Sequence, residues 1–242
     1  MPANRVLEVK GSSFTGSLRL LAKFVAVAVD LSRGSVPHGL KLLPYVSAGV
    51  SWLKWTIAGI PNSKLPCFGS RLELLNYAAA KAPRNGLWLE FGVWKGESIN
   101  EIAKFAPGTV YGFDSFEGLP EWWTPTSGRG RFSTSGALPK TANNVALVKG
   151  LFRDTLPNFL ESNPEMTVTF VHIDSDLYSS ASYVLSELAR RINSGAVVVF
   201  DEFTGLLPDD EARAFREFIR TRDASFEYIG YSASGSIAIK IG

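Results

Sequence analysis

The chain has 242 residues, of which 45% are hydrophobic, and its formal net charge at pH 7 is +2. This length suits one sizeable α/β domain with an appendage, and the mild, scattered charge gives no reason to expect nucleic acid as a partner. The single cysteine, Cys67, excludes an intramolecular disulfide framework and indicates a reducing, cytoplasmic compartment.

Residues 1–65 contain two distinctly apolar segments, SLRLLAKFVAVAVDL and YVSAGVSWLKWTIAGI. Neither reaches the roughly 18 uninterrupted apolar residues of a membrane-spanning helix, because Lys23, Asp30 and Lys54 intrude. The first residues also lack the pattern of a cleaved signal peptide. We therefore predict an N-terminal helical extension that forms a cap over the site, a dimer contact or a contact with a membrane surface.

Residues 66–242 form the second predicted unit, in which helical and strand patterns alternate. Continuous apolar strands between amphipathic helices indicate an α/β fold with a mostly parallel sheet covered on both faces. The last two strands are joined by a short turn containing Ala-Ser-Gly and must therefore pair as an antiparallel hairpin. The predicted helices are 70–82, 96–106, 153–162, 179–192 (closed by Gly195) and 208–222, and the predicted strands are 86–92, 109–114, 144–150, 168–174, 196–202, 225–231 and 236–242.

Carboxylates follow nearly every strand of this predicted core. In an open parallel sheet, ligands bind beyond the carboxyl ends of the strands, near the point where the strand order reverses. A purely structural sheet has no need of acids there, because crowded carboxylates raise one another's pKa and cost stability. The strand endings are Glu90 with Gly92 and Gly96, Asp114, Lys149 with Gly150, Asp174 with Asp176, and Asp201 with Glu202.

The segment LEFGVWKGES has the strand, glycine turn and helix layout of a nucleotide-binding unit. Asp114 closes the next strand, where an acid can accept hydrogen bonds from both hydroxyls of a ribose. Together they predict an adenosine-type ligand, although the glycine segment alone could be a tight structural turn. The middle glycine of the dinucleotide fingerprint is missing near Trp94, which disfavours a nicotinamide-dependent oxidoreductase.

Asp174 and Asp176 point to the same side of their strand if the extended conformation persists. Asp201 and Glu202 end the following strand, so three or four carboxylates could meet at one edge and bind a hard divalent cation such as Mg²⁺, Mn²⁺ or Ca²⁺. The alternative is that Asp176 caps the next helix while Asp201 and Glu202 cap a loop. His172 is either a second candidate base or, more commonly at such a position, a buried, hydrogen-bonded histidine.

The segment 117–144 is long, polar and glycine-rich, which is typical of a lid or a substrate-binding loop. Its Trp122 and Trp123 could stack on a sugar or anchor the lid, and Arg129 or Arg131 could meet an anionic group of an acceptor. The alternative is a loop that is merely mobile.

Five motifs of the chain resemble one family in order and spacing: LEFGVWKGESI, VYGFDSFEGLPEWW, VKGLFRDTLP, VHIDSDLYSS and VVVFDEF. They are similar to the macrocin and mycinamicin (TylF/MycF-like) sugar O-methyltransferases, class I enzymes that use S-adenosylmethionine (SAM). The match covers about residues 68–242. It implies a Rossmann-like class I methyltransferase fold, with a mostly parallel sheet of the seven predicted strands and an antiparallel C-terminal hairpin.

The resemblance also implies roles for the residues at the strand ends. Those around SAM are Glu90, Gly92 and Ser98 at its methionine part, Asp114, Ser115 and Phe116 at its ribose and adenosine, and Lys149, Gly150 and Phe152 beside its adenine. Asp174, Asp201 and Glu202 match the Mg²⁺ ligands, and Asp176 matches the general base, which makes Asp174 and Asp176 the catalytic pair. The family usually has two consecutive aspartates where this chain has Asp201-Glu202, and the glutamate reaches one methylene further.

The implied function is transfer of a methyl group from SAM to a hydroxyl of a small-molecule acceptor, a sugar of a glycosylated natural product or of a glycolipid. A divalent cation would bind two neighbouring hydroxyls and lower the pKa of one, and Asp176 would take its proton. The expected protein is a cytoplasmic homo-oligomer, with membrane association through residues 1–65 as an option. The alternative is a methyltransferase-like protein without catalysis that acts as a peripheral membrane or interaction module.

Overall fold

The structure is a computed structural model that describes residues 65–203, 210–222 and 224–242. The predicted helical extension, residues 1–65, lies outside the described residues except for its last position. In the part of the chain that is described, none of the helices combines the length and apolarity that crossing a bilayer requires.

A single sheet of eight strands forms the centre of the described part, in the order β1-β7-β8-β6-β5-β2-β3-β4. β8 runs antiparallel to both β6 and β7, and all the other neighbouring pairs are parallel. The mostly parallel sheet with an antiparallel C-terminal hairpin is therefore confirmed, and the short strand β1 adds an eighth to the seven expected. The strands are β1 (Cys67–Phe68), β2 (Leu87–Phe91), β3 (Val110–Asp114), β4 (Val145–Lys149), β5 (Val168–Ile173), β6 (Ile192–Phe200), β7 (Phe226–Ser232) and β8 (Ile237–Ile241).

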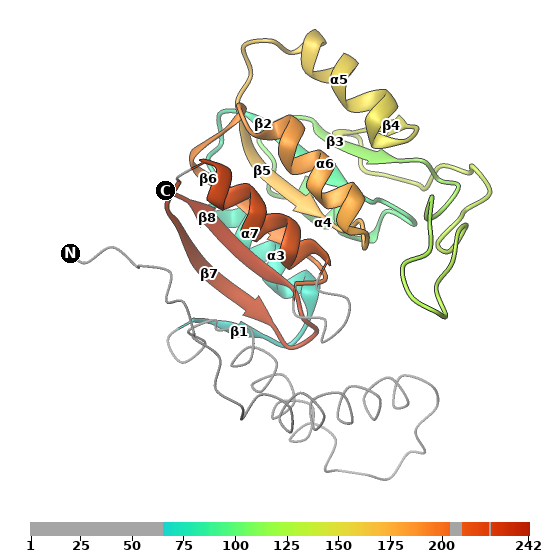
Figure 1. The fold of residues 1–242 in the computed structure, drawn as a ribbon. Coiled ribbons are helices and arrows are strands. Elements are labelled where there is room, and N and C mark those ends of the chain that lie inside the picture. Colours follow the sequence, from blue (N-terminus) through green and yellow to red (C-terminus); the bar gives the residue numbers. More distant parts are fainter. Residues whose placement is uncertain (1–64, 204–209, 223) are drawn as a thin grey trace, which may run out of the picture. The chain divides into compact units, whose positions relative to one another are not determined.

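Helices cover both faces of the sheet (Figure 1). They are α3 (Arg71–Lys81), α4 (Glu97–Ala103), α5 (Phe152–Ser162), α6 (Tyr178–Leu188) and α7 (Asp210–Arg222). Helices α5, α6 and α7 share one buried cluster with Phe91, Phe113 and Phe200, whereas α3 and α4 share another with Trp88 and Phe170. Neighbouring strand residues alternate between the two clusters, as expected for a sheet that is buried on both faces.

Helix α3 brings its first residue to the edge of the sheet that carries the predicted site. The helix begins after Ser70, whose hydroxyl accepts a hydrogen bond from the N–H of Glu73 at 3.2 Å and so caps the N-terminus. Leu75 and Ala79 are buried against the sheet, as their helical spacing predicts. The packing of this face fixes the position of Arg71 at the start of the helix.

One predicted boundary is wrong. Helix α6 ends at Leu188, and β6 already begins at Ile192, so Gly195 lies inside a strand and does not close the helix. Gly195 has φ +88°, which glycine adopts without strain, and the β5–β6 register is irregular after Val168. The apolar Ile192 fits the pattern of a helix and that of a strand, but its pairing with Val168 places it in the sheet.

The strand order reverses at β2, which pairs with β3 on one side and with β5 on the other. The loops that follow β2 and β5 therefore meet at this switch point. Gly92, at φ +95°, lies so close to the β5 loop that a Cβ atom would come within 1.8 Å of the carbonyl oxygen of Asp174. The position therefore requires glycine, and it joins two of the predicted site segments.

Candidate functional site

Two of the predicted metal ligands lie side by side at the carboxyl edge of the sheet. Asp174 and Asp201 follow the neighbouring strands β5 and β6. Nη1 of Arg71 donates to Oδ2 of both carboxylates at 3.1 Å. The side chains are 32% (Arg71), 22% (Asp174) and 11% (Asp201) exposed, so the cluster is largely shielded from solvent. This edge therefore holds an arginine between two aspartates, and sequence reasoning missed the arginine because no motif marks it.

Burial and mutual repulsion dominate the electrostatics of this cluster. Burial raises the pKa of Asp174 well above its usual value and Asp201 adds to the effect, while the charge of Arg71 opposes it. Burial by itself lowers the pKa of Arg71, but the charges of Asp201 and Asp174 raise that pKa overall. Arg71 therefore stays protonated and favours the ionised form of Asp174.

Asp176 follows Asp174 in a conformation that the sequence did not predict. The strand ends at Ile173 and Asp176 has φ +59°, so the extended conformation that would give both aspartates the same side does not persist. The N-cap of α6 is Leu177 and no side chain caps that helix, so Asp176 does not have the capping role considered as an alternative. A left-handed conformation at a residue other than glycine costs about 1–3 kcal/mol and is often found at functional sites.

The carboxyl group of Asp176 is poised to exchange a proton near neutral pH. Burial, followed by repulsion from Asp201, raises the pKa of Asp176 to about 7 against the opposing charges of Arg131 and Arg71. A general base works best when its pKa lies near the operating pH. The geometry therefore permits the predicted role of Asp176.

Glu211, at the start of α7, joins the two loops that carry these acids. Its Oε1 accepts a hydrogen bond from the N–H of Ser175 at 3.1 Å, and its Oε2 accepts one from the N–H of Glu202 at 3.0 Å. Burial raises the pKa of this fully buried carboxyl group well above its usual value, although the two backbone hydrogen bonds oppose the shift. Sequence reasoning missed Glu211 because only the tertiary fold brings α7 to this edge.

His172 is a buried, hydrogen-bonded residue, which was the more common interpretation of its position. Its Nδ1 lies 2.8 Å from Oε1 of Glu90 on the neighbouring strand. The second oxygen of Glu90, Oε2, is buried and has no hydrogen-bond partner among the described residues. Because a buried carboxylate oxygen without a donor is costly, this atom fits the N–H group of a ligand.

Asp114 ties the glycine segment after β2 to the end of β3. Its Oδ2 accepts hydrogen bonds from the N–H groups of Val93 and Trp94, each at 2.8 Å, and its Oδ1 accepts one from the N–H of Phe116 at 2.7 Å. An ionised carboxylate offers about four acceptor positions, so one remains for a ligand hydroxyl. The residue therefore shapes the loop and keeps a limited capacity to bind a ribose.

The other residues predicted to surround the cofactor differ in their placement. Gly150 lies beside Asp114 and donates its N–H to the carbonyl oxygen of that residue at 3.0 Å. The ring of Phe152 packs edge-on against Phe91, with centroids 5.3 Å apart. Ser98 and Phe116 are buried, the Oγ of Ser115 accepts from the N–H of Glu117 at 3.1 Å, and Nζ of Lys149 donates to the carbonyl oxygen of Gly136 at 2.8 Å.

The long segment 117–144 folds back on itself and is attached to α6. Leu119 exchanges backbone hydrogen bonds with Gly130 and Arg131, each at 2.9 Å. The hydroxyl of Ser179 at the start of α6 donates to Oε1 of Glu121 at 2.5 Å. Through Arg131 the segment also contributes positive charge near the acidic edge, so it borders the site.

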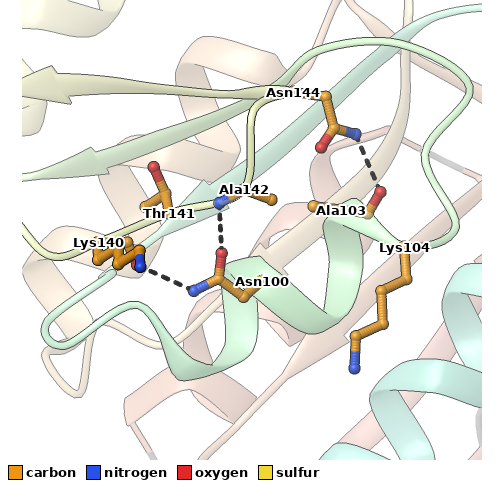
Figure 2. Close-up of a pocket in the computed structure, with 7 residues that line it drawn as sticks. All are labelled: Asn100, Ala103, Lys104, Lys140, Thr141, Ala142 and Asn144. Atoms are coloured by element: carbon orange, nitrogen blue, oxygen red, sulfur yellow. Dashed lines mark hydrogen bonds between the residues drawn. The ribbon is translucent and has the colours of Figure 1, made fainter.

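A surface groove of about 480 Å³ lies near the amino ends of β3 and β4, away from the acidic edge (Figure 2). Asn100 bridges its wall by donating to the carbonyl oxygen of Lys140 at 3.2 Å and accepting from the N–H of Ala142 at 2.7 Å. Asn144 donates to the carbonyl oxygen of Ala103 at 2.9 Å. None of the predicted site residues lines the groove. The two asparagines form hydrogen bonds with nearby backbone groups.

Part of the chain is similar to a known protein family. Residues 89–203, which run from β2 to the loop after β6, match the family described as a methyltransferase domain. This part of the chain is similar to methyltransferase domains. This family agrees with the predicted enzyme class, a SAM-dependent O-methyltransferase.

Individual relatives are similar to the chain at low identity. A Streptomyces olivaceus enzyme named 8-demethyl-8-(2,3-dimethoxy-alpha-L-rhamnosyl)-tetracenomycin-C 4'-O-methyltransferase is 26% identical over 163 residues, which cover 55% of this chain and 60% of that enzyme. The structure of the O-methyltransferase NovP is similar with a TM-score of 0.53 and 21% identity, over 70% of this chain and 78% of that one. The calicheamicin methyltransferase CalS11 is similar with a TM-score of 0.56 and 18% identity, over 99% of each chain. The class I methyltransferase fold is thereby confirmed.

The acidic edge of the sheet does not fit a divalent cation in the arrangement described. Ligand atoms of His172, Asp174 and Asp201 lie within 4.8 Å of one another, and this group does not include Glu202. A Mg²⁺ ion held by both aspartates would lie about 2.1 Å from each oxygen. Nη1 of Arg71 already lies 3.1 Å from the same two oxygens, and two cations at such close range repel strongly.

Proposed function

We propose that this chain is a SAM-dependent O-methyltransferase of the TylF/MycF-like group, acting on a sugar hydroxyl of a glycosylated natural product or glycolipid. Two observations carry the proposal: the unpartnered buried oxygen of Glu90 on β2, and the near-neutral acid Asp176 in the loop after β5. The methyltransferase-domain match supports the reaction class. The name of the Streptomyces olivaceus relative, a 4'-O-methyltransferase of a rhamnosyl compound, supports a sugar acceptor.

The residues at the edge suit each part of SAM, which would supply a methyl group bound to a positively charged sulfur. Oε2 of Glu90 would accept a hydrogen bond from the amino group of the methionine part. The remaining acceptor position of Asp114 would bind a ribose hydroxyl.

The reaction also needs a base, because a sugar hydroxyl does not ionise unaided near neutral pH. Asp176 would accept the hydroxyl proton while the oxygen bonds to the methyl carbon and the carbon–sulfur bond breaks. With a pKa of about 7, the carboxyl group is available in its ionised form near neutral pH. General-base catalysis of this kind contributes about 10²- to 10⁴-fold to the rate, and the rest would come mainly from positioning.

Metal dependence through Asp174, Asp201 and Glu202 stays a prediction, and none of the steps above requires it. Homo-oligomerisation, a cytoplasmic location and contact with a membrane surface also stay predictions. The noncatalytic alternative depends on residues 1–65 as the main contact, and nearly all of these lie outside the described residues.

Calorimetric titration of the full chain with SAM, S-adenosylhomocysteine and NAD tests the proposal. We expect the first two to bind and NAD not to bind. Glu90→Gln keeps an oxygen for His172 but loses the charge, so SAM affinity should fall about tenfold or more, the scale of a lost charge-assisted hydrogen bond. Asp176→Asn is the matched control and should bind SAM as the wild type does.

Two results would contradict this assignment. If neither SAM nor S-adenosylhomocysteine binds, the edge is not a cofactor site and the noncatalytic alternative gains support. If SAM binds equally well to the wild type and to Glu90→Gln, the unpartnered oxygen of Glu90 does not hold the amino group.

A further inference from the structure

Arg71 occupies the centre of the acidic edge. Its guanidinium donates to three carboxylates that come from three different elements. Nη1 reaches Asp174 and Asp201, both at 3.1 Å, and Nη2 reaches Oε2 of Glu97 at 3.3 Å. Because networks of this kind fix a side chain better than an isolated surface pair does, Arg71 is held in place.

The position of Arg71 on its own helix is unfavourable without these acids. It is the first residue of α3, where the partial positive charge of the helix N-terminus disfavours a cation. It is also only 32% exposed, so part of its hydration is lost. The carboxylates that follow β5 and β6 and the one at the start of α4 offset these costs, so the arginine and the acids form one unit.

We propose that Arg71 is the resident cation of the Asp174–Asp201 pair and that it competes with divalent cations for this position. The inference concerns the acidic edge of the sheet. It rests on the proposed function only in treating this edge as the active site. In the arrangement described, Arg71 has to withdraw before a metal ion can bind both aspartates. The apparent metal affinity is then reduced by the fraction of molecules in which Arg71 stays engaged.

Removal of Arg71 should convert the pair into a metal site. Without the guanidinium, two largely buried carboxylates have lost their shared countercharge, which is a costly state that a hard divalent cation relieves. The inference therefore predicts that a variant lacking this positive charge binds a divalent metal ion more tightly than the wild type does.

The test is a calorimetric titration of Mn²⁺ into the full 242-residue chain in the absence of SAM, so the result does not depend on methyl transfer. We expect Arg71→Gln to bind Mn²⁺ about tenfold or more tightly than the wild type. The double variant Arg71→Gln with Asp201→Asn should lose this gain, which locates the ion. Arg84→Gln, a substitution of an exposed arginine beyond the end of α3, should behave as the wild type does.

Three outcomes would overturn the inference. The first is equal or weaker Mn²⁺ binding by Arg71→Gln, including no binding by either protein. The second is a gain that persists in the double variant. The third is micromolar Mn²⁺ binding by the wild type. This result would overturn the inference even if Arg71→Gln fails to fold. Cofactor titration is a separate measurement, so a failure here is distinguishable from a failure of the proposed function.

Discussion

Glu211→Gln should weaken the connection between the two loops of the acidic edge while changing the shape of the side chain very little. In the structure, one carboxylate oxygen accepts the N–H of Ser175 at 3.1 Å and the other accepts the N–H of Glu202 at 3.0 Å. A glutamine offers one oxygen and one amino group, and the amino group can only donate. One of the two buried backbone donors would therefore face another donor.

The expected size of the effect follows from this mismatch. Leaving a buried donor unsatisfied costs about 1–3 kcal/mol, so we expect the free energy of unfolding to fall by about 2 kcal/mol. The loss should depend on pH. Because burial raises the pKa of Glu211 in the folded protein, its contribution to stability is fully present below the unfolded pKa and is lost as pH rises through the folded pKa. Glutamine does not titrate, so the difference between the two proteins should shrink as pH rises.

Urea unfolding of both proteins at two pH values, about 5 and about 8, measures this directly. Glu161→Gln, at an exposed position of α5, is the control for a glutamate without such a role and should leave stability nearly unchanged. If Glu211→Gln is as stable as the wild type at the lower pH, the two backbone hydrogen bonds do not stabilise the loops as we infer. A difference that grows with pH would refute the direction of the pKa shift.

Three further predictions concern the reaction and the switch point. The rate of methyl transfer should fall as pH drops through about 7, because only the ionised form of Asp176 accepts a proton, and its pKa is about 7. Asp176→Asn should lower kcat by about 10²- to 10⁴-fold, and a fully active variant would contradict the base role. Gly92→Ala should lose about 3 kcal/mol or more in urea unfolding, since its Cβ would lie 1.8 Å from the carbonyl oxygen of Asp174 at φ +95°. Stability equal to that of the wild type would show that the two loops separate easily.

Sequence patterns predicted those residues of the site that lie at or near the ends of strands. Glu90, Asp114 and Asp201 could be placed on one edge because parallel strands share the direction of their carboxyl ends. Arg71 and Glu211 could not be predicted, because each lies on a helix whose position relative to the edge is set by packing rather than by local sequence. The same limit explains the error at the α6–β6 boundary. The apolar Ile192 fits both a helical and a strand periodicity, and its pairing with Val168 in the sheet decides between them.

Arg71, one of the two missed residues, affects the acid that the sequence did identify. Asp201 raises the pKa of Asp176, and Arg71 lowers it. Burial and Asp201 raise this pKa, and the charges of Arg131 and Arg71 limit the rise. We therefore expect Arg71 to affect proton transfer through the pKa of Asp176. The chemistry of this edge thus depends on a helix that precedes every catalytic motif in the chain.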